Sequence, residues 1–240
     1  QNIKVLHVET PNHVQLIDKL VWVNRFDEAL KLIYYNKDSE QITDVLYPKD
    51  DHHEGKLLRM KQEYFCSTIG LQNIIDEHIK KHKTIINFHE FNVLHINDTH
   101  MSWVVPELMR ILLDEFGLTW EDSWFITQHS VTYTNHTVLQ EAMEKWDIHM
   151  VKSLLPRIYM IIEEINRRQN ETYDKAIIRD NMIITANMLV EAAYSVNGVA
   201  EIHSEIIKKE TFKEFNHKFP TKFKNCTNGI EGRKWLLCDG

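Results

Sequence analysis

The sequence predicts an α/β protein built around a mainly parallel β-sheet, and two observations lead to that class. First, runs rich in β-branched and aromatic residues, such as 91–96 and 130–135, are separated by longer segments with helical periodicity. This alternation is typical of βαβ units. Second, the 240 residues include only 5 Pro and 7 Gly, so long helices are expected. No repeat or linker divides the chain, and we expect residues 1–240 to form a single unit.

The first half of the chain begins with a predicted strand at 3–9, where apolar and polar residues alternate, and continues with helical pieces within 14–35. Pro, Asp, His and Gly are concentrated in 45–56, which predicts a loop. Apolar residues at helical spacing predict three helices around the strand at 91–96, and these span 57–82, 103–116 and 119–128.

The second half begins with the strand at 130–135, whose Val, Thr and Tyr favour extended structure. A helical block is predicted from 138 to 168, because apolar residues recur there at helical spacing and would form a buried stripe. The remaining predicted elements are a helix at 180–195, a break at 196–199, a helix at 200–208, and a short strand with a turn at 222–229.

Composition argues against several classes of function. The net charge is −7, and binding to a nucleic-acid backbone requires a basic face. No apolar run reaches the roughly 18 residues of a membrane-spanning helix, and the first residues lack the pattern of a signal peptide. The cysteines, Cys66, Cys226 and Cys238, form no CxxC pair, so a reducing, cytoplasmic environment is expected.

Polar side chains follow three of the predicted strands, at the point where each strand ends. The segments are Asn97 to His100, Thr134 to Thr137, and Thr227 to Gly229. In an open parallel sheet the strand C-termini share one edge, and ligands bind in the crevice outside it. Short donors and acceptors with a single formal charge, at Asp98, suit a neutral polyol such as a sugar. The alternative is that Asn97 to Thr99 simply cap the helix that follows.

Metal and hydrolase sites receive less support. His52 to Glu54 and His89-Glu90 lack the HExxH spacing that places two histidines on one helix face, so we expect no metal site. The sequence also has no G-x-S-x-G elbow and no Gly-rich phosphate loop. An α/β hydrolase with a histidine-rich site stays an alternative at this point.

Six collinear motifs carry a more specific signal. They are VLYPKDDHHEGKLLRMKQEYF, INDTHMSWVVPELMRILLDEFGLTW, YTNHTVLQEAMEKW, LLPRIYMIIEEINRR, SVNGVAEIHSEIIKKETFKEF and FPTKFKNCTNGIEGRKWL. Together they resemble the second half of the N-terminal domain of the α-1,4-glucan phosphorylases, the glycogen, starch and maltodextrin phosphorylases. The resemblance covers most of residues 45–237, whereas 1–44 match only loosely.

The resemblance implies a helix-rich part of a Rossmann-like N-terminal domain in the two-domain glycosyltransferase type B architecture. It implies phosphorolysis of non-reducing-end α-1,4 bonds of a glucan to glucose 1-phosphate, with retention, in a cytoplasmic homodimer. The cofactor, pyridoxal phosphate, would be bound by a lysine of a C-terminal domain absent from this chain. We therefore expect a fragment that is inactive alone. The alternative is a non-catalytic glucan-binding or regulatory module.

The resemblance also implies roles for single residues. His136 would bind the glucosyl unit through its backbone carbonyl, Asn228 would hydrogen-bond the 6-hydroxyl, and Val199 would pack against the sugar ring. Tyr47 would stack on an acceptor sugar. The acceptor side would be lined by Asp98, His100, Tyr133 and Glu141, and a mobile loop that gates the cleft would contain Asp50 and Asp51.

The sequence departs from the family pattern at several of these motifs. The departures are Asp51 in place of an amide, Met101 and Gln140 in place of prolines, Tyr194 in place of histidine, and Glu231, Gly232 and Lys234 after the TNG motif. Lost prolines loosen turns. We expect these changes to affect rate and chain-length preference rather than the fold.

Overall fold

The computed structural model describes residues 3–5, 21–23, 49–139, 142–169 and 176–229. Its central sheet is parallel, with the strand order β3-β4-β8-β9. These strands span Leu94–Asn97, Val131–Thr134, Ser195–Gly198 and Phe223–Asn225. The predicted class, a mixed α/β protein with a parallel sheet, is confirmed.

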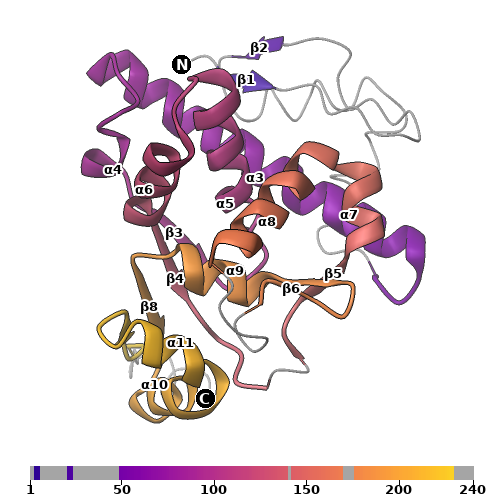
Figure 1. Ribbon diagram of the computed structural model, residues 1–240, viewed down its shortest axis with the longest axis vertical. Helices are drawn as coiled ribbons and strands as arrows, with labels where there is room; N and C mark the ends of the chain where they lie inside the picture. The colour runs from indigo at the N-terminus through magenta and orange to yellow at the C-terminus, as the bar shows by residue number, and fades with distance from the viewer. Residues whose placement is uncertain (1–2, 6–20, 24–48, 140–141, 170–175, 230–240) are drawn as a thin grey trace, which may run out of the picture.

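Helices surround this sheet (Figure 1). The long helix α3 (His53–His82) crosses the molecule, and α4 (Phe88–Phe91) follows it. Helix α5 (Val104–Arg110) is central, because it contacts α3, α8 and α9 as well as α6. The neighbouring helices are α6 (Trp120–Ser130), α7 (Ile148–Leu154), α8 (Pro156–Gln169) and α9 (Thr185–Ala192). At the other end of the view lie α10 (Glu201–Ile206) and α11 (Lys213–Lys218).

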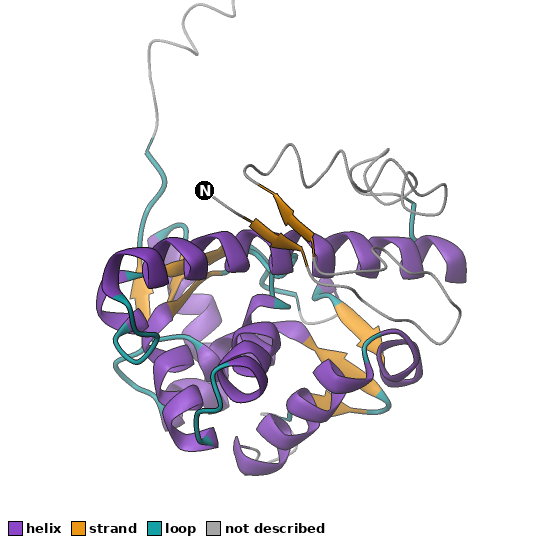
Figure 2. Ribbon diagram, turned by 90° about the horizontal axis from the view of Figure 1, so that it is seen from above, coloured by secondary structure: helices purple, strands orange, loops and turns teal. Residues whose placement is uncertain are grey.

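Two smaller antiparallel sheets accompany the central one. Strands β5 (Lys145–Asp147), β7 (Met182–Ile184) and β6 (Ile178–Arg179) form one of them, in that order. Strands β1 (Ile3–Val5) and β2 (Val21–Val23) form the other, which lies against α3 (Figure 2). The helical interpretation of 14–35 is therefore wrong at 21–23, and the rest of that range lies outside the described residues.

The predicted helical block 138–168 is wrong in its first part and interrupted in its second. Strand β5 occupies 145–147, and the Asp147 carboxylate then caps α7 by accepting from the backbone N–H of His149 and Met150. Helix α7 ends because Pro156 has no N–H to continue it, whereas a proline is well suited to begin α8.

The predicted helix 180–195 is shorter, and the predicted break at 196–199 is a strand. Asp180 and Asn181 have φ angles of 52° and 60° and form the two-residue turn between β6 and β7. Asp and Asn tolerate this left-handed conformation, which a type I′ hairpin turn requires at both positions. Helix α9 follows, and Ser195–Gly198 then forms β8 between β4 and β9.

Other boundaries differ less. Helix α3 begins at His53, inside the predicted loop. The helices α5 and α10 each continue into a π-helical turn, at Ile111–Glu115 and Ile207–Thr211, and α4 and α11 were not predicted. The core is formed by side chains of α5, α8, α9 and the central strands, and Val105, Leu108, Ile162, Leu189 and Val196 are fully buried within it.

Candidate functional site

The C-terminal ends of the four central strands lie side by side. Backbone hydrogen bonds continue past the strands, from Asp98 N–H to Thr134 O at 2.9 Å and from Asn135 N–H to Asn197 O at 2.9 Å. At the other edge, Asn228 N–H donates to Val199 O at 3.0 Å. The predicted convergence of the polar strand ends is thus confirmed, and it includes the end of β8, which was predicted as a break.

Asp98 is held in an unusual backbone conformation at this edge. Its φ angle is 65°, in the left-handed region, and its Oδ1 accepts from the backbone N–H of Thr99 at 2.8 Å. Helix α5 begins later, at Val104, with Trp103 as its N-cap residue and without a side-chain capping bond. The polar residues after β3 therefore do not cap that helix, which argues against the capping alternative. Such conformations concentrate at functional sites.

A cavity of about 530 Å³ opens beside Asp98. Its wall combines the first turns of α3, the turn after β3, the end of β4 and the start of β5. Four of the predicted site residues line it, namely Asp50, Asp98, His100 and Tyr133. The ring of Tyr133 is fully buried, and its hydroxyl accepts from the side-chain amide of Asn135 at 2.9 Å. The lining is polar and carries both charge signs, which suits hydroxyl-rich ligands.

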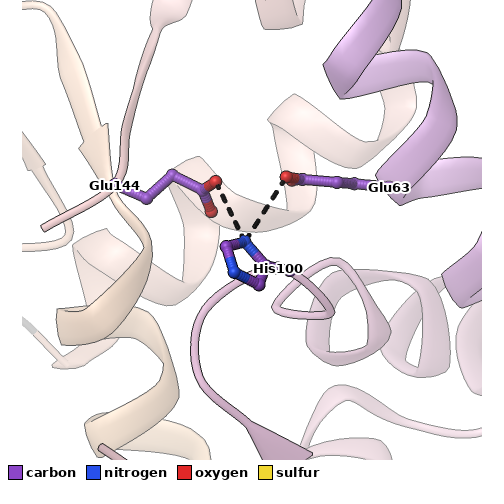
Figure 3. A group of neighbouring side chains, drawn as sticks. All are labelled: Glu63, His100 and Glu144. Atoms are coloured by element: carbon purple, nitrogen blue, oxygen red, sulfur yellow. Dashed lines mark ion pairs between the residues drawn. The ribbon is translucent and has the colours of Figure 1, made fainter. Parts of the chain in front are cut away.

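Charged side chains gather around His100, a residue of the cavity wall. Glu63 and Glu144 lie on either side of His100, whose Nδ1 is 3.8 Å from Glu63 Oε1 and 3.7 Å from Glu144 Oε1 (Figure 3). Both distances exceed that of a hydrogen bond, so the attraction is mainly one of charge. Arg59 completes the group, with Nε donating to Glu63 Oε1 at 3.2 Å and a terminal nitrogen 3.5 Å from Glu144 Oε1.

The protonation of this group differs from that of free side chains. The carboxylates of Glu144 and Glu63 raise the pKa of His100 to about 10. Burial raises the pKa of Glu63 to about 7, although Arg59 and His100 oppose that rise. His100 is therefore an imidazolium at neutral pH. Perturbed groups of this kind in a cavity mark candidate functional sites.

Three of the remaining predicted residues, His136, Val199 and Asn228, follow the ends of central strands and lie outside the cavity lining. His136 Nε2 is 2.6 Å from Asn97 Oδ1, which joins the ends of β3 and β4. The backbone N–H of Val199 donates to His203 Nδ1 at 3.1 Å, and Asn228 is exposed. Asp51 is also exposed and contacts His52 at 3.0 Å. Tyr47 and Glu141 lie outside the described residues.

Sequence reasoning missed the charged lining residues Lys56, Arg59, Glu144 and Lys145, and also Glu63, which lies beside His100. Arg59 and Glu63 lie four residues apart on α3, so their contact could have been predicted as a helical i,i+4 pair. Glu144 and His100 belong to different elements, and only the tertiary structure brings them together. Glu63, His100 and Glu144 place ligand-type atoms within 4.8 Å of one another. The guanidinium of Arg59 already supplies a cation there.

Comparison with known proteins identifies the family. Residues 12–239 match the family described as carbohydrate phosphorylase. The chain belongs to the carbohydrate phosphorylase family. It is 51% identical over 198 residues to the glycogen phosphorylase of Bacillus subtilis, covering 78% of this chain and 25% of that protein. The alternative of an unrelated α/β hydrolase is therefore wrong.

Plant and animal relatives agree with this family. The chain is 42% identical over 201 residues to the α-glucan phosphorylase H isozyme of Vicia faba, covering 76% of this chain and 24% of the relative. It is 43% identical over 211 residues to the muscle glycogen phosphorylase of Ovis aries, covering 77% and 25%. The chain thus spans about a quarter of the length of the curated relatives it matches.

Besides Asp51, two of the departures from the family motifs are visible in the structure. Met101 is partly buried against the core, and its sulfur accepts from the Ser67 hydroxyl at 3.5 Å. Tyr194 is 65% exposed, with its ring 5.9 Å from that of His129. Gln140, Glu231, Gly232 and Lys234 lie outside the described residues. In the described part of the chain, no helix has both the length and the apolar character needed to cross a bilayer.

Proposed function

We propose that this chain forms one wall of the active site of an α-1,4-glucan phosphorylase. The observation that carries the proposal is the strand edge, where the ends of β3, β4, β8 and β9 bring uncharged hydrogen-bonding groups together beside a cavity, in a chain of the phosphorylase family. The proposed reaction is phosphorolysis of the non-reducing-end α-1,4 bond of glycogen or maltodextrin to glucose 1-phosphate, with retention of configuration.

The proposed roles follow the position of each residue. Asn228 and His136 would bind the glucosyl unit, the former through its amide and the latter through its carbonyl, and Val199 would offer an apolar surface to the ring. These three residues follow the ends of β9, β4 and β8, which are neighbouring strands of the sheet. Aliphatic and amide groups suit the two kinds of surface that a pyranose presents.

The acceptor side of the glucan would lie at the cavity. Asp98, His100 and Tyr133 line it, and Tyr47 and Glu141 are proposed to join them. Asp50 and Asp51 belong to the segment that would close over the site. A closed segment would exclude water, which phosphorolysis requires because water competes with phosphate for the oxocarbenium-like centre.

Pyridoxal phosphate is the cofactor proposed for the whole enzyme, where its phosphate group would exchange a proton with the substrate phosphate. Lys222, the lysine whose pKa burial lowers, does not fit a site for it. Burial lowers the pKa of the Lys222 ammonium to about 8, but its Nζ donates to Val190 O at 2.9 Å and Glu191 O at 3.1 Å, and Lys222 is not part of the cavity lining. We therefore place the cofactor in a second domain of a glycosyltransferase type B enzyme, a cytoplasmic homodimer of which this chain is a part.

Assay of the complete gene product tests this proposal. With maltodextrin and inorganic phosphate it should release glucose 1-phosphate, and the 240-residue chain alone should not. Asn228→Ala should lower kcat/KM by roughly a hundredfold, since a buried sugar hydroxyl loses its partner. The matched change Asn216→Ala on α11 should leave it unaltered. A complete product without activity, binding maltodextrin in calorimetry through Asn228, would favour the glucan-binding module instead.

A further inference from the structure

We propose that Arg59 and Glu63 are positioning residues that couple the segment 49–52 (the gate segment) to His100 in the cavity wall. Closure of the gate segment and the orientation of His100 would then depend on each other. Any effect of this coupling on the binding of glucan or phosphate rests on the proposed function. The coupling itself involves only described residues, and it can be measured without turnover.

The first link joins the gate segment to α3. The terminal nitrogen Nη1 of Arg59 donates to Asp50 Oδ2 at 2.9 Å. The Asp50 side chain is half exposed, whereas that of Arg59 is only 19% exposed. The segment also packs directly on the helix, because a Cβ added at Gly55 would lie 1.9 Å from the Lys49 carbonyl oxygen. The segment is thus seated by one ion pair and one close backbone contact.

The second link is the orientation of the guanidinium. Its three nitrogens face three different carboxylates: Nη1 faces Asp50, Nε faces Glu63 and Nη2 faces Glu144. A guanidinium is planar and rigid, so these contacts fix its plane together. Movement of Asp50 therefore removes one of the constraints on the group that holds Glu63.

The third link runs from Glu63 to His100 through a single atom. Glu63 Oε1 accepts from Arg59 Nε at 3.2 Å and lies 3.8 Å from His100 Nδ1. Its Oε2 accepts from the indole N–H of Trp103 at 3.2 Å. The Glu63 side chain is 3% exposed, so water cannot replace a lost partner there. A buried carboxylate responds strongly when one of its cations is displaced.

The charge balance around His100 comes from every element that faces the cavity. Helix α3 contributes Lys56, Arg59 and Glu63, the gate segment Asp50, the turn after β3 Asp98, and the start of β5 Glu144 and Lys145. Figure 3 shows both carboxylates on the side of the Nδ1 atom, with the second ring nitrogen turned away from them. Loss of the charge on Glu63 would therefore weaken the electrostatic attraction that keeps the His100 ring protonated and oriented.

The test uses the complete gene product with ¹³C-labelled histidine, with the His100 signal assigned by its loss in His100→Gln. We expect Asp50→Asn and Glu63→Gln each to lower the titration midpoint of His100, the second by at least about one pH unit. Hydrogen–deuterium exchange in 49–52 should accelerate roughly tenfold in Arg59→Met and Glu63→Gln. Glu164→Gln is the matched control, since this partly exposed glutamate on α8 also pairs with arginines.

Coupling requires that a change in the gate segment affects His100 and that a change beside His100 affects the gate segment. If Asp50→Asn leaves the His100 midpoint unchanged, or if Glu63→Gln leaves exchange in 49–52 unchanged, the proposal is overturned. If Glu63→Gln fails to fold, Arg59→Lys replaces it, because lysine keeps the positive charge but cannot face three carboxylates at once. Arg59→Lys must then both lower the His100 midpoint and accelerate exchange in 49–52. A complete product that shows the coupling but releases no glucose 1-phosphate would reject the proposed function alone.

Discussion

Gly55→Ala should displace the start of the chain that leads into α3 without unfolding the helix. An ideal Cβ at this position lies 1.9 Å from the carbonyl oxygen of Lys49 and 2.8 Å from the His52 ring. A carbon–oxygen contact needs about 3.3 Å, so the Lys49 carbonyl must move by about 1.4 Å. The obstacle is backbone rather than the end of a flexible side chain. A shift of that size is enough to break the 2.9 Å contact between Asp50 and Arg59.

The same helix supplies the control. Gly70 is also in α3, and no atom of the described residues lies within 4 Å of a Cβ added there. Replacement of an interior helical glycine by alanine stabilises a helix by about 1 kcal/mol. Gly70→Ala should therefore raise the free energy of unfolding by that amount. The free energy of unfolding should rise by less in Gly55→Ala, because the displacement of segment 49–52 offsets part of the gain in helix propensity.

Hydrogen–deuterium exchange separates the two variants. In the complete gene product, Gly55→Ala should speed exchange in 49–52 and lower kcat/KM for maltodextrin, whereas Gly70→Ala should change neither. Chemical denaturation of both variants supplies the stability comparison. If exchange in 49–52 is the same in Gly55→Ala as in the wild type, the contact between Lys49 and Gly55 does not seat the segment, and the reasoning fails.

Three further predictions concern the strand edge and its supports. Asp98→Ala should lower the free energy of unfolding, measured in denaturant, by about 1–2 kcal/mol, because a φ angle of 65° strains alanine. Asp98→Asn should lower it by less than about 0.5 kcal/mol, because asparagine tolerates this conformation. Equal losses of stability in the two variants would refute the backbone argument. Gly198→Ala should cost about 1–3 kcal/mol, because its Cβ would meet Ser204 N at 2.9 Å, whereas Gly229→Ala, with no atom of the described part of the chain within 4 Å, should be neutral. The pKa of Lys222 is about 8 in the folded protein, against 10.5 for the free group. Between these two pH values the unfolded chain binds more protons than the folded chain, so the free energy of unfolding, relative to that of Lys222→Met, should rise with pH. A difference in free energy of unfolding that stays constant across this window would contradict the prediction.

The sequence predicted the strand edge well because two local signals agreed there. Extended runs with β-branched residues ended in short polar side chains, and the parallel arrangement then required those ends to meet. Strand β8 was missed because Val196 is its only buried apolar side chain. Its extended structure depends on pairing with β4 and β9, which are distant in sequence.

The helical interpretation of 180–195 was correct for 185–192 but wrong at 180–184, for a different reason. Residues 182–184 are apolar and fit a buried helix or a strand equally well. The turn signal in Asp180-Asn181 was present and decided the matter, because both residues adopt positive φ angles. Only part of the charged cavity wall could be predicted from the sequence. Local spacing predicts the Arg59–Glu63 pair, but Glu144 lies just before β5, far from α3 in sequence, and only the tertiary structure brings it to Arg59.

Hydrogen bonding distinguishes the carboxylate at the cavity from one in the core. Glu107 is fully buried, and it accepts from Tyr64 at 2.7 Å and twice from Arg110, at 3.0 and 2.8 Å. Among the described residues, both buried oxygens of Glu144 lack a hydrogen bond, and Oε1 instead forms ion pairs with Arg59 at 3.5 Å and with His100 at 3.7 Å. The carboxylate at the cavity is therefore held by charge, whereas the one in the core is held by hydrogen bonds. Glu144 lies in the cavity lining, so if the acceptor side of the glucan occupies this cavity as proposed, saturating maltodextrin should protect the peptide containing Glu144 from exchange in the complete gene product; unchanged exchange there would argue against that placement.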